Sequence, residues 1–490
     1  MLWRMSTLPY DTIFQNHPEE HAFRVTTTTG TVPTDLAGTF LRTGPGLLEL
    51  GDARLNFFDG HAMVAGVSFA NGEATFRSRF VRTPLYEEET AKKTVVKRRI
   101  FTNHPSRWSN VLALDLGNSA MHDVYPWGDG EHLRVVAGND GGHFALDPRT
   151  LATKGPERWG GAAPKGHEMG PMPYRDPATG NLVGWVKKPG DVRPDRIKFV
   201  ELDGAFRVVN ETPFHALGAS PAIVHDQRAT TRWYVATEAA VRLSPAKALW
   251  GASTVFESFD IPAGATATLL LVPRKGGGAM IRVPLPDPFV IAFHVINAFE
   301  DGDHVVVDLV TYDKRIPFEA YAPPALRDQA TSTDRTPDAR PVRFRVDPGT
   351  ARVVEHRPLT TLVGEPPEVS DAVLGKPYRF AYFASTTTKI PDRGFFTHFD
   401  AVTRVDVETG ETRAWDAGGL ASPVAFVARP GATAEDDGWL LVWVARQQGS
   451  AVAVLDAQRI ESGPVATLEL GLELPGVSHT RWAAGVQLAP

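Results

Sequence analysis

The sequence predicts an all-β fold in which many short strands are joined by tight turns. The 490-residue chain holds 44 Gly and 39 Pro, and these turn-forming residues are dispersed along the chain rather than clustered. Between them lie short runs rich in β-branched and aromatic residues, separated by turn dipeptides such as Asn71-Gly72 and Asp203-Gly204. Helical patterns are few. A closed ring of four-stranded sheets is therefore expected, because closure hides the sheet edges.

The expected strands follow one another along the whole chain. Two helices are expected between them, one at Pro84–Lys93 and a short one at Ala246–Trp250, for which Ser244 and Pro245 supply the N-cap and a first-turn proline. No repeat of fixed period is visible and no long linker divides the chain, so residues 1–490 are expected to form a single domain. The expected strands are Gly38–Arg42, Ala62–Phe69, Ala74–Arg82, Leu133–Ala137, Leu182–Lys187, Ile197–Leu202, Trp233–Thr237, Thr268–Val272, Val305–Val310, Val342–Val346, Arg404–Val407, Trp439–Val444 and Ala451–Leu455.

The stretch 288–313 is the most informative part of the chain. Residues 288–299 are almost wholly apolar and predict a strand that is buried on both faces. Glu300–Asp303 predicts a tight turn, and His304–Asp313 alternates like a half-exposed second strand. His294 lies in the middle of the buried strand, where its ring nitrogens need partners. A backbone carbonyl or a water is the simple explanation, and a metal ion is the alternative.

Composition excludes several classes of function. The net charge of −6 and the pI near 6.2 provide no basic stripe for nucleic acid. The absence of cysteine excludes disulfides, thiolate nucleophiles and Cys-ligated zinc or iron–sulfur sites. The first residues contain no secretory signal and no run of 18 apolar residues occurs, so a cytoplasmic protein is expected.

Segments from both ends and the middle of the chain carry a family signature. They are FLRTGPG at 40–46, FFDGHAMVAGVSF at 57–69, SRFVRT at 78–83, HFALDPRT at 143–150, MPYRDPATGNLVGW at 172–185, IVHD at 223–226, FHVINAFE at 293–300, RPGATAEDDGWL at 429–440 and PGVSHTRW at 475–482. In this order, and over essentially the entire chain, they resemble the carotenoid cleavage oxygenases, also called the retinal pigment epithelial membrane protein family. The resemblance implies a seven-bladed β-propeller with helices and loops that cap one face.

The resemblance also implies a non-haem Fe(II) ion on the propeller axis, held by four histidines. Three of these positions carry over to His225, His294 and His479. Neutral imidazole is a good ligand for ferrous iron and leaves positions open for dioxygen. Because these residues are far apart in the sequence, only a fold that brings distant strands to a common axis can unite them.

The fourth position departs from the family pattern. The histidine of the family aligns with Met172, whose thioether is a poor ligand for ferrous iron and a better filler of a core. His167, five residues upstream, is the alternative, although a loop histidine is the simpler interpretation of it. The site is then a three-histidine iron site, a site with an additional open position, or one without metal. Other histidines, among them His61, His122 and His143, are interpreted as surface or strand-end residues.

The residues behind the ligands depart as well. The family uses glutamates to accept the second ring N–H of three ligand histidines, which fixes tautomer and orientation. Glu365 matches one of these positions, whereas the other two are Asn139 and Ser422. The resemblance implies that Asn139 would orient a ring at the Met172 position. The two changes are therefore consistent with each other.

The function that the resemblance implies is a dioxygenase. It would add dioxygen across a conjugated C=C bond of an apolar apocarotenoid or stilbene to give two carbonyl products. The alternatives are isomerase or monooxygenase chemistry at an altered three-histidine site, and a metal-poor propeller that binds a hydrophobic ligand. The apolar stretch Ala265–Val272, beside the short helix, lies where the family has its substrate entrance. A peripheral contact with membrane or lipid and a plain core strand are equally good interpretations of it.

Overall fold

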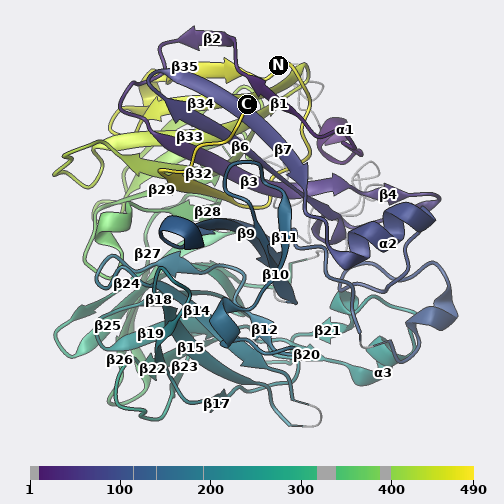
Figure 1. The fold of residues 1–490 in the computed structure, drawn as a ribbon. Helices are drawn as coiled ribbons and strands as arrows, with labels where there is room; N and C mark the ends of the chain where they lie inside the picture. Colours follow the sequence, from purple (N-terminus) through teal and green to yellow (C-terminus); the bar gives the residue numbers. More distant parts are fainter. Residues whose placement is uncertain (1–9, 114, 140, 191–192, 317–337, 387–398) are drawn as a thin grey trace, which may run out of the picture.

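Strands dominate the computed structural model, in agreement with the all-β prediction (Figure 1). The structure describes residues 10–490 except 114, 140, 191–192, 317–337 and 387–398. Within these residues the strands form seven sheets of four to six strands, together with two short two-stranded ribbons. We call the seven sheets blades 1 to 7 in the order in which the chain enters them.

The first three blades contain the following strands, each blade given from its outer to its inner edge. Blade 1 consists of β1 (Ala22–Arg24), β7 (Glu73–Phe80), β6 (His61–Ala70), β3 (Gly38–Leu47) and β36 (Thr480–Ala484). Blade 2 consists of β11 (Thr153–Glu157), β10 (Gly142–Leu146), β9 (Arg134–Asn139) and β8 (Asp123–Trp127). Blade 3 consists of β16 (Val208–Glu211), β17 (His215–Ala216), β15 (Arg196–Leu202), β14 (Leu182–Lys188), β13 (Tyr174–Arg175) and β12 (Glu168–Met169).

The other four blades are built in the same way. Blade 4 consists of β23 (Ile281–Pro284), β22 (Thr268–Pro273), β19 (Trp233–Glu238) and β18 (Val224–Ala229). Blade 5 consists of β27 (Arg352–Pro358), β26 (Arg340–Asp347), β25 (His304–Tyr312) and β24 (Ile291–Asp301). Blade 6 consists of β31 (Thr412–Asp416), β30 (Ala401–Asp406), β29 (Phe380–Ser385) and β28 (Gly364–Glu368). Blade 7 consists of β2 (Thr27–Gly30), β35 (Pro464–Glu469), β34 (Gly449–Asp456), β33 (Gly438–Arg446) and β32 (Leu420–Ala428).

The inner strands of the blades stand side by side around a central hub. Strand β18 packs against β24, β24 against β28, β28 against β32, β32 against β36, and β36 against β8. Blade 3 fills the remaining gap, because β12 contacts β10 of blade 2 and β14 contacts β18 of blade 4. The ring is therefore closed, and the prediction of a seven-bladed propeller is confirmed.

Two blades combine strands from opposite ends of the described chain. Strand β36 pairs with β3 in blade 1, with Arg42 opposite Thr480. Strand β2 pairs with β35 in blade 7, with Thr27 opposite Glu469. These two pairings close the ring by backbone hydrogen bonds and leave no open sheet edge at the junction.

The stretch 288–313 forms the β24–β25 hairpin, as expected. Strand β24 is buried along nearly its whole length because it lies at the hub between neighbouring blades. The prediction that the second strand is half exposed is wrong, since β25 is buried from Val305 to Tyr312. It pairs with β24 on one side and β26 on the other, and adjacent blades cover both faces. Its polar residues therefore form hydrogen bonds with partners inside the protein. Asp308, for example, accepts hydrogen bonds from Arg343 and Tyr378.

Helices are few, and Figure 1 shows α1, α2 and α3 on the same side of the molecule. Helix α2 (Pro84–Lys92) begins at Thr83, whose hydroxyl accepts from the N–H of Tyr86. Helix α3 (Pro245–Leu249) is the second expected helix, and α1 (Tyr10–Ile13) is a single turn. The apolar stretch Ala265–Val272 ends in the core strand β22 (Thr268–Pro273), in which Leu269–Val272 are fully buried. No helix among the described residues is long and apolar enough to cross a membrane.

Candidate metal centre

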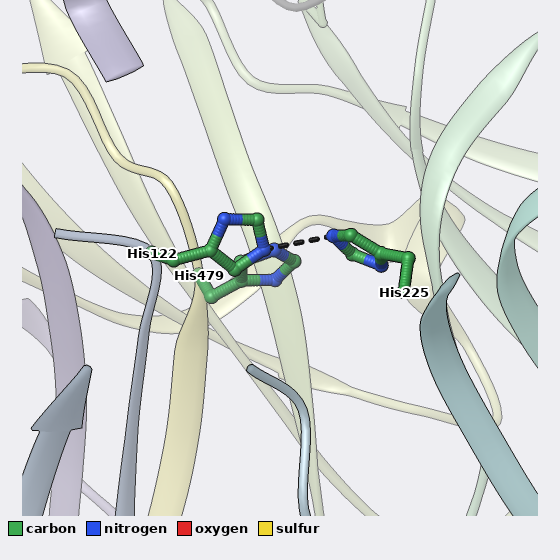
Figure 2. A group of neighbouring side chains, drawn as sticks. All are labelled: His122, His225 and His479. Atoms are coloured by element: carbon green, nitrogen blue, oxygen red, sulfur yellow. Dashed lines mark hydrogen bonds between the residues drawn. The ribbon is translucent and has the colours of Figure 1, made fainter. Parts of the chain in front are cut away.

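Four histidine rings from four different blades meet at the hub. His225 lies in β18 and His294 in β24, while His122 and His479 directly precede β8 and β36. Figure 2 shows three of them, His122, His225 and His479, with their rings turned toward one another. His294 and His479 are buried, and His122 and His225 are only partly accessible.

The nitrogen atoms of these rings are close enough to share one ion. Nε2 of His122 lies 2.8 Å from Nε2 of His225, and one ring nitrogen from each of His122, His225 and His479 lies within 4.8 Å of the others. Adjacent ligands with metal bonds of about 2.1 Å are themselves about 3 Å apart in an octahedral site and about 3.4 Å apart in a tetrahedral one. The ring centroid of His294 is 4.9 Å from that of His225 and 5.4 Å from that of His479. The fourth ring thus borders the same space.

Interruptions of the strand pairing place these residues at the hub. The register of β18 shifts between Val224 and Gln227, and that of β24 shifts between Ala292 and Val295. His225 and His294 lie within these two interruptions. A β-bulge re-aims side chains that a regular strand would send into the sheet faces. The register of β28 shifts between Gly364 and Pro367, and that of β32 shifts between Ala421 and Val424. These two interruptions contain Glu365 and Ser422.

A buried carboxylate joins the strands that carry His225 and His294. Asp226, adjacent to His225, accepts a hydrogen bond from the backbone N–H of Val295 at 2.9 Å. The carboxylate thereby satisfies a buried backbone donor next to the interruption of β24. Arg228 balances the charge at 2.9 Å. The separation of the two histidines is thereby fixed by a side-chain bridge as well as by the packing of the blades.

His294 is oriented by the one glutamate that matches the expected pattern. Its Nδ1 lies 2.5 Å from Oε1 of Glu365, which also accepts from the hydroxyl of Tyr312 at 3.0 Å. In the neutral ring, Nδ1–H donates to this carboxylate and Nε2 carries the lone pair. Nε2 is buried and has no hydrogen-bond partner among the described residues. A buried acceptor without a partner is costly, and a metal ion at the hub would satisfy it.

The loop that carries His479 is held by β3. The backbone N–H of Thr43 donates to the carbonyl of His479 at 3.0 Å, and the N–H of Ser478 donates to the carbonyl of Thr43 at 2.8 Å. The buried guanidinium of Arg42 donates to the carbonyls of Pro475 and Gly476. These contacts fix the backbone on both sides of the ring.

Burial sets the charge state of the four rings. It lowers the pKa of His122 to about 3 and, helped by the neighbouring histidines, lowers the pKa values of His225 and His479 well below the usual value. Burial also disfavours the charged form of His294, but the charge and hydrogen bond of Glu365 outweigh it and raise its pKa. Three of the imidazoles are therefore neutral at pH 7, which is the form that binds metal.

The two candidates for the fourth position do not join this group of rings in any contact that the structure describes. The ring of His167 packs against Phe214 at a centroid distance of 5.9 Å, in the loop before β12. Met172 is buried in the gap between β12 and β13, and its carbonyl accepts from the side chain of Gln227 at 2.7 Å. Blade 3 thus supplies a methionine where its inner edge is interrupted.

The two substituted positions behind the ligands serve their own backbone. Oδ1 of Asn139 accepts from the N–H of Gly141 at 3.2 Å in the β9–β10 turn. The hydroxyl of Ser422 donates to the carbonyl of Pro423 at 2.6 Å and accepts from the N–H of Trp443 at 3.0 Å. None of these hydrogen bonds reaches a histidine, so of the three expected positions only Glu365 orients one of the four rings in the described structure.

His122 is the residue that sequence reasoning missed, and its interpretation as a surface or strand-end residue is incomplete. It does precede a strand, but its ring lies at the hub. A signal was present: the dipeptide His122-Asp123 repeats His225-Asp226, and both aspartates are buried and paired with arginine. His61 and His143 are also buried, where they contact Glu89 and Tyr125, so they are core residues.

A cavity adjoins the hub on the side of blades 6 and 7. Its volume is small, about 50 Å³. Its mostly apolar wall includes Phe399, Leu420 and Trp443. Pro366 and Ser478, which adjoin Glu365 and His479 in the chain, also line it. Its wall thus brings apolar side chains next to the segments that carry Glu365 and His479.

Comparison with known proteins agrees with this architecture. Residues 13–484 match the family model described as retinal pigment epithelial membrane protein. The chain is 32% identical to apocarotenoid-15,15'-oxygenase of Synechocystis sp. over 96% of its length and 95% of that protein. It is 27% identical to isoeugenol monooxygenase of Pseudomonas nitroreducens over 92% and 93%. The crystal structure of the cobalt-substituted Synechocystis apocarotenoid oxygenase has a TM-score of 0.87 and 29% identity, covering 97% of this chain and 99% of that one.

Proposed function

Because the chain belongs to the retinal pigment epithelial membrane protein family, that of the carotenoid cleavage oxygenases, we propose that it is a non-haem Fe(II) dioxygenase. It cleaves a conjugated C=C bond of an apolar apocarotenoid or a stilbene-type alkene into two carbonyl products. The observation that carries the proposal is the meeting of His225, His294 and His479 at the hub.

These residues fit a ferrous ion. His294 presents an unpartnered, buried Nε2 toward its neighbours, and the two other rings are held neutral by burial. Imidazole ligands suit iron, and a set without a carboxylate leaves positions open. His225, His294 and His479 would hold the ion, which would bind and activate dioxygen.

The chain itself supplies alignment and an apolar environment. Glu365 keeps the ring of His294 in one tautomer and one orientation. The cavity beside the hub provides a mostly apolar wall for the alkene. In that wall Nε of Arg42 and Nε1 of Trp443 are buried donors without partners among the described residues.

The relatives support this class of substrate. Besides the apocarotenoid oxygenase and the isoeugenol monooxygenase, they include lignostilbene-alpha,beta-dioxygenase isozyme III of Sphingomonas paucimobilis, which is 25% identical over 94% of this chain and 93% of that protein. Their names point to conjugated alkenes joined to apolar or aromatic groups.

Cleavage is expected to require dioxygen. Iron-loaded protein incubated in air with an apocarotenoid aldehyde or a hydroxystilbene should form two carbonyl products, measured by liquid chromatography and mass spectrometry. Under argon the alkene should remain unchanged. An isomerised alkene under argon would instead identify an isomerase, and a preparation that cannot take up iron yet binds the alkene would identify a binding protein.

Monooxygenation is the second candidate reaction, and the similarity to an isoeugenol monooxygenase favours it. Labelled dioxygen separates the two candidates. A dioxygenase places one labelled atom in each carbonyl product, whereas a monooxygenase places label in only one of them. Short reaction times are needed, because aldehydes exchange oxygen with water.

An exposed apolar patch supports peripheral contact with a membrane. Trp108, Leu112 and Trp250 are 85%, 68% and 69% exposed. They are neighbours, since the N–H of Leu112 donates to the carbonyl of Leu249 at 3.1 Å, and Arg98 donates to the carbonyls of Asn110 and Ala248. Large apolar side chains gathered at one exposed place are typical of interaction surfaces. We include this contact, through which an apolar substrate would reach the protein, in the proposal.

Removing the two tryptophans should weaken this contact. The double variant Trp108→Ser, Trp250→Ser is expected to bind phosphatidylcholine vesicles about 100-fold more weakly or worse in a flotation assay, since burying one large apolar side chain contributes on the order of 1.5–3 kcal/mol and each 1.4 kcal/mol is about tenfold in affinity. Val354→Ser, which removes an apolar side chain that is 51% exposed on blade 5, is the matched control and should bind as the unmodified protein does. Equal binding by both variants would contradict a membrane contact at this patch.

A further inference from the structure

The ring of His122 faces that of His225 across the hub (Figure 2). We propose that His122 is a fourth metal ligand, contributed by blade 2, which stands in for the ligand that blade 3 lacks at Met172. The inference rests on the metal site of the proposed function but does not depend on the reaction.

The topology assigns each blade one position at the hub. In blades 4 and 5 the interruptions of the inner strands place His225 and His294 there. In blade 3 the corresponding gap, between β12 and β13, holds Met172. In blades 1 and 2 the residues directly before the inner strands, His479 and His122, take this position. Four of these five blades therefore present an imidazole at the hub.

The contact between His122 and His225 lacks the partners of a structural histidine. A hydrogen bond between two neutral rings requires that one Nε2 carries a proton and the other does not. In the described structure the ring of His122 makes no other hydrogen bond that would fix this proton. The buried histidines outside the hub differ, because His61 contacts the carboxylate of Glu89 and His143 the hydroxyl of Tyr125. With an ion at the hub, both Nε2 lone pairs would be used.

The backbone of His122 is fixed where a ligand needs it. Its N–H donates to the carbonyl of Gly138 at 3.1 Å, which anchors the residue to β9. The next residue, Asp123, is buried and forms an ion pair with Arg481 at 3.2 Å. Because Arg481 lies two residues after His479, this ion pair ties together the two segments that carry His122 and His479.

Among the described residues no carboxylate orients the ring of His122, unlike that of His294. Asn139, which follows the Gly138 that anchors His122, uses its side-chain oxygen in its own turn. Outer partners of this kind typically change metal affinity by about 10–100-fold. His122 is therefore expected to be a weaker ligand than His294, whose ring Glu365 holds.

X-ray absorption spectroscopy of the Co(II)-loaded protein tests the proposal. The spectrum of the unmodified protein should fit four imidazole ligands. His122→Phe, which keeps a ring of similar size but removes the nitrogens, should fit three, and its Co(II) affinity should fall about tenfold or more. His215→Ala removes a histidine from the outer part of blade 3 and should keep four imidazoles.

The possible outcomes separate the role of His122 from the reaction. Three imidazoles in the unmodified protein, or an equal count and affinity in His122→Phe, would overturn the proposal. The unmodified protein decides the count even if the variant does not fold. Four imidazoles without alkene cleavage would refute the proposed function and leave the fourth ligand in place. Alkene cleavage by an unmodified protein with three imidazole ligands would support the proposed function and overturn the fourth ligand.

A double variant tests whether blades 2 and 3 are interchangeable as the source of the fourth ligand. Adding Met172→His to His122→Phe should restore the fourth imidazole and most of the lost affinity. A count that stays at three would refute the statement that His122 stands in for the Met172 position.

Discussion

Replacing His294 by alanine is expected to abolish stoichiometric iron binding and, with it, alkene cleavage. This residue has the best-prepared ligand atom of the hub, since Glu365 holds its Nδ1 at 2.5 Å and its Nε2 has no partner in the described structure. The substitution also leaves the fully buried carboxylate of Glu365 with a single described partner, the hydroxyl of Tyr312. An unsatisfied buried group of this kind costs about 1–3 kcal/mol or more of folding stability.

Iron per chain, measured by plasma mass spectrometry after anaerobic loading and desalting, tests this expectation. His143→Ala is the matched control, because His143 is equally buried and hydrogen-bonded to Tyr125 but lies outside the hub. The control should lose stability and keep its iron. A His294→Ala protein that is folded and still holds one iron per chain would show that the ion lies elsewhere.

Replacing Glu365 by leucine is expected to have the second largest effect. Without the carboxylate, the ring of His294 loses the acceptor that fixes its tautomer and orientation, and the hydroxyl of Tyr312 loses its described partner. Metal affinity should fall about 10–100-fold. Glu365→Gln keeps an acceptor oxygen but removes the charge, so its loss should be smaller. Competition with a fluorescent chelator gives the three affinities on one scale.

Glu368→Gln serves as the control for this series. It lies on the same strand, and its carboxylate accepts from the N–H of Phe426 at 3.3 Å rather than from a histidine. Burial raises the pKa of Glu368 to about 7, so a neutral glutamine resembles the protonated acid that is already present near neutral pH. Equal metal affinity in Glu365→Leu and in the unmodified protein would contradict an orienting role for Glu365.

The sequence predicts most of the fold, because the signals of this fold are local. Turn dipeptides and short β-branched runs mark the strands, and Ser244-Pro245 marks the start of α3, although the side chain of Ser244 makes no capping hydrogen bond there. The exposure of β25 could not be predicted in this way. Its alternation of polar and apolar residues indicates one solvent-exposed face, but the neighbouring blades cover both faces. Asp308 accepts hydrogen bonds from Arg343 and Tyr378 inside the protein.

The histidines were predicted unequally for a physical reason. His225, His294 and His479 lie in segments whose neighbours carry a recognisable pattern. His122 reaches the hub because the inner strand of blade 2 begins one residue after it, which depends on pairing between Asp123 and Gly138. Such a register is a tertiary property. The resemblance identified Met172 as the aligned fourth ligand position, but it could not show that the ring of His122, from the adjacent blade 2, lies at the hub.

The pairing of β36 with β3 has a consequence for assembly. Arg42 and Gly476 are in contact although 434 residues separate them, and bringing such distant segments together costs loop entropy that local hairpins avoid. His479 reaches its place only when this junction forms, so an incompletely folded chain lacks the complete set of ligands. Uptake of the ion would thus report that the ring has closed, and the bound ion would in turn stabilise the closed state by mass action.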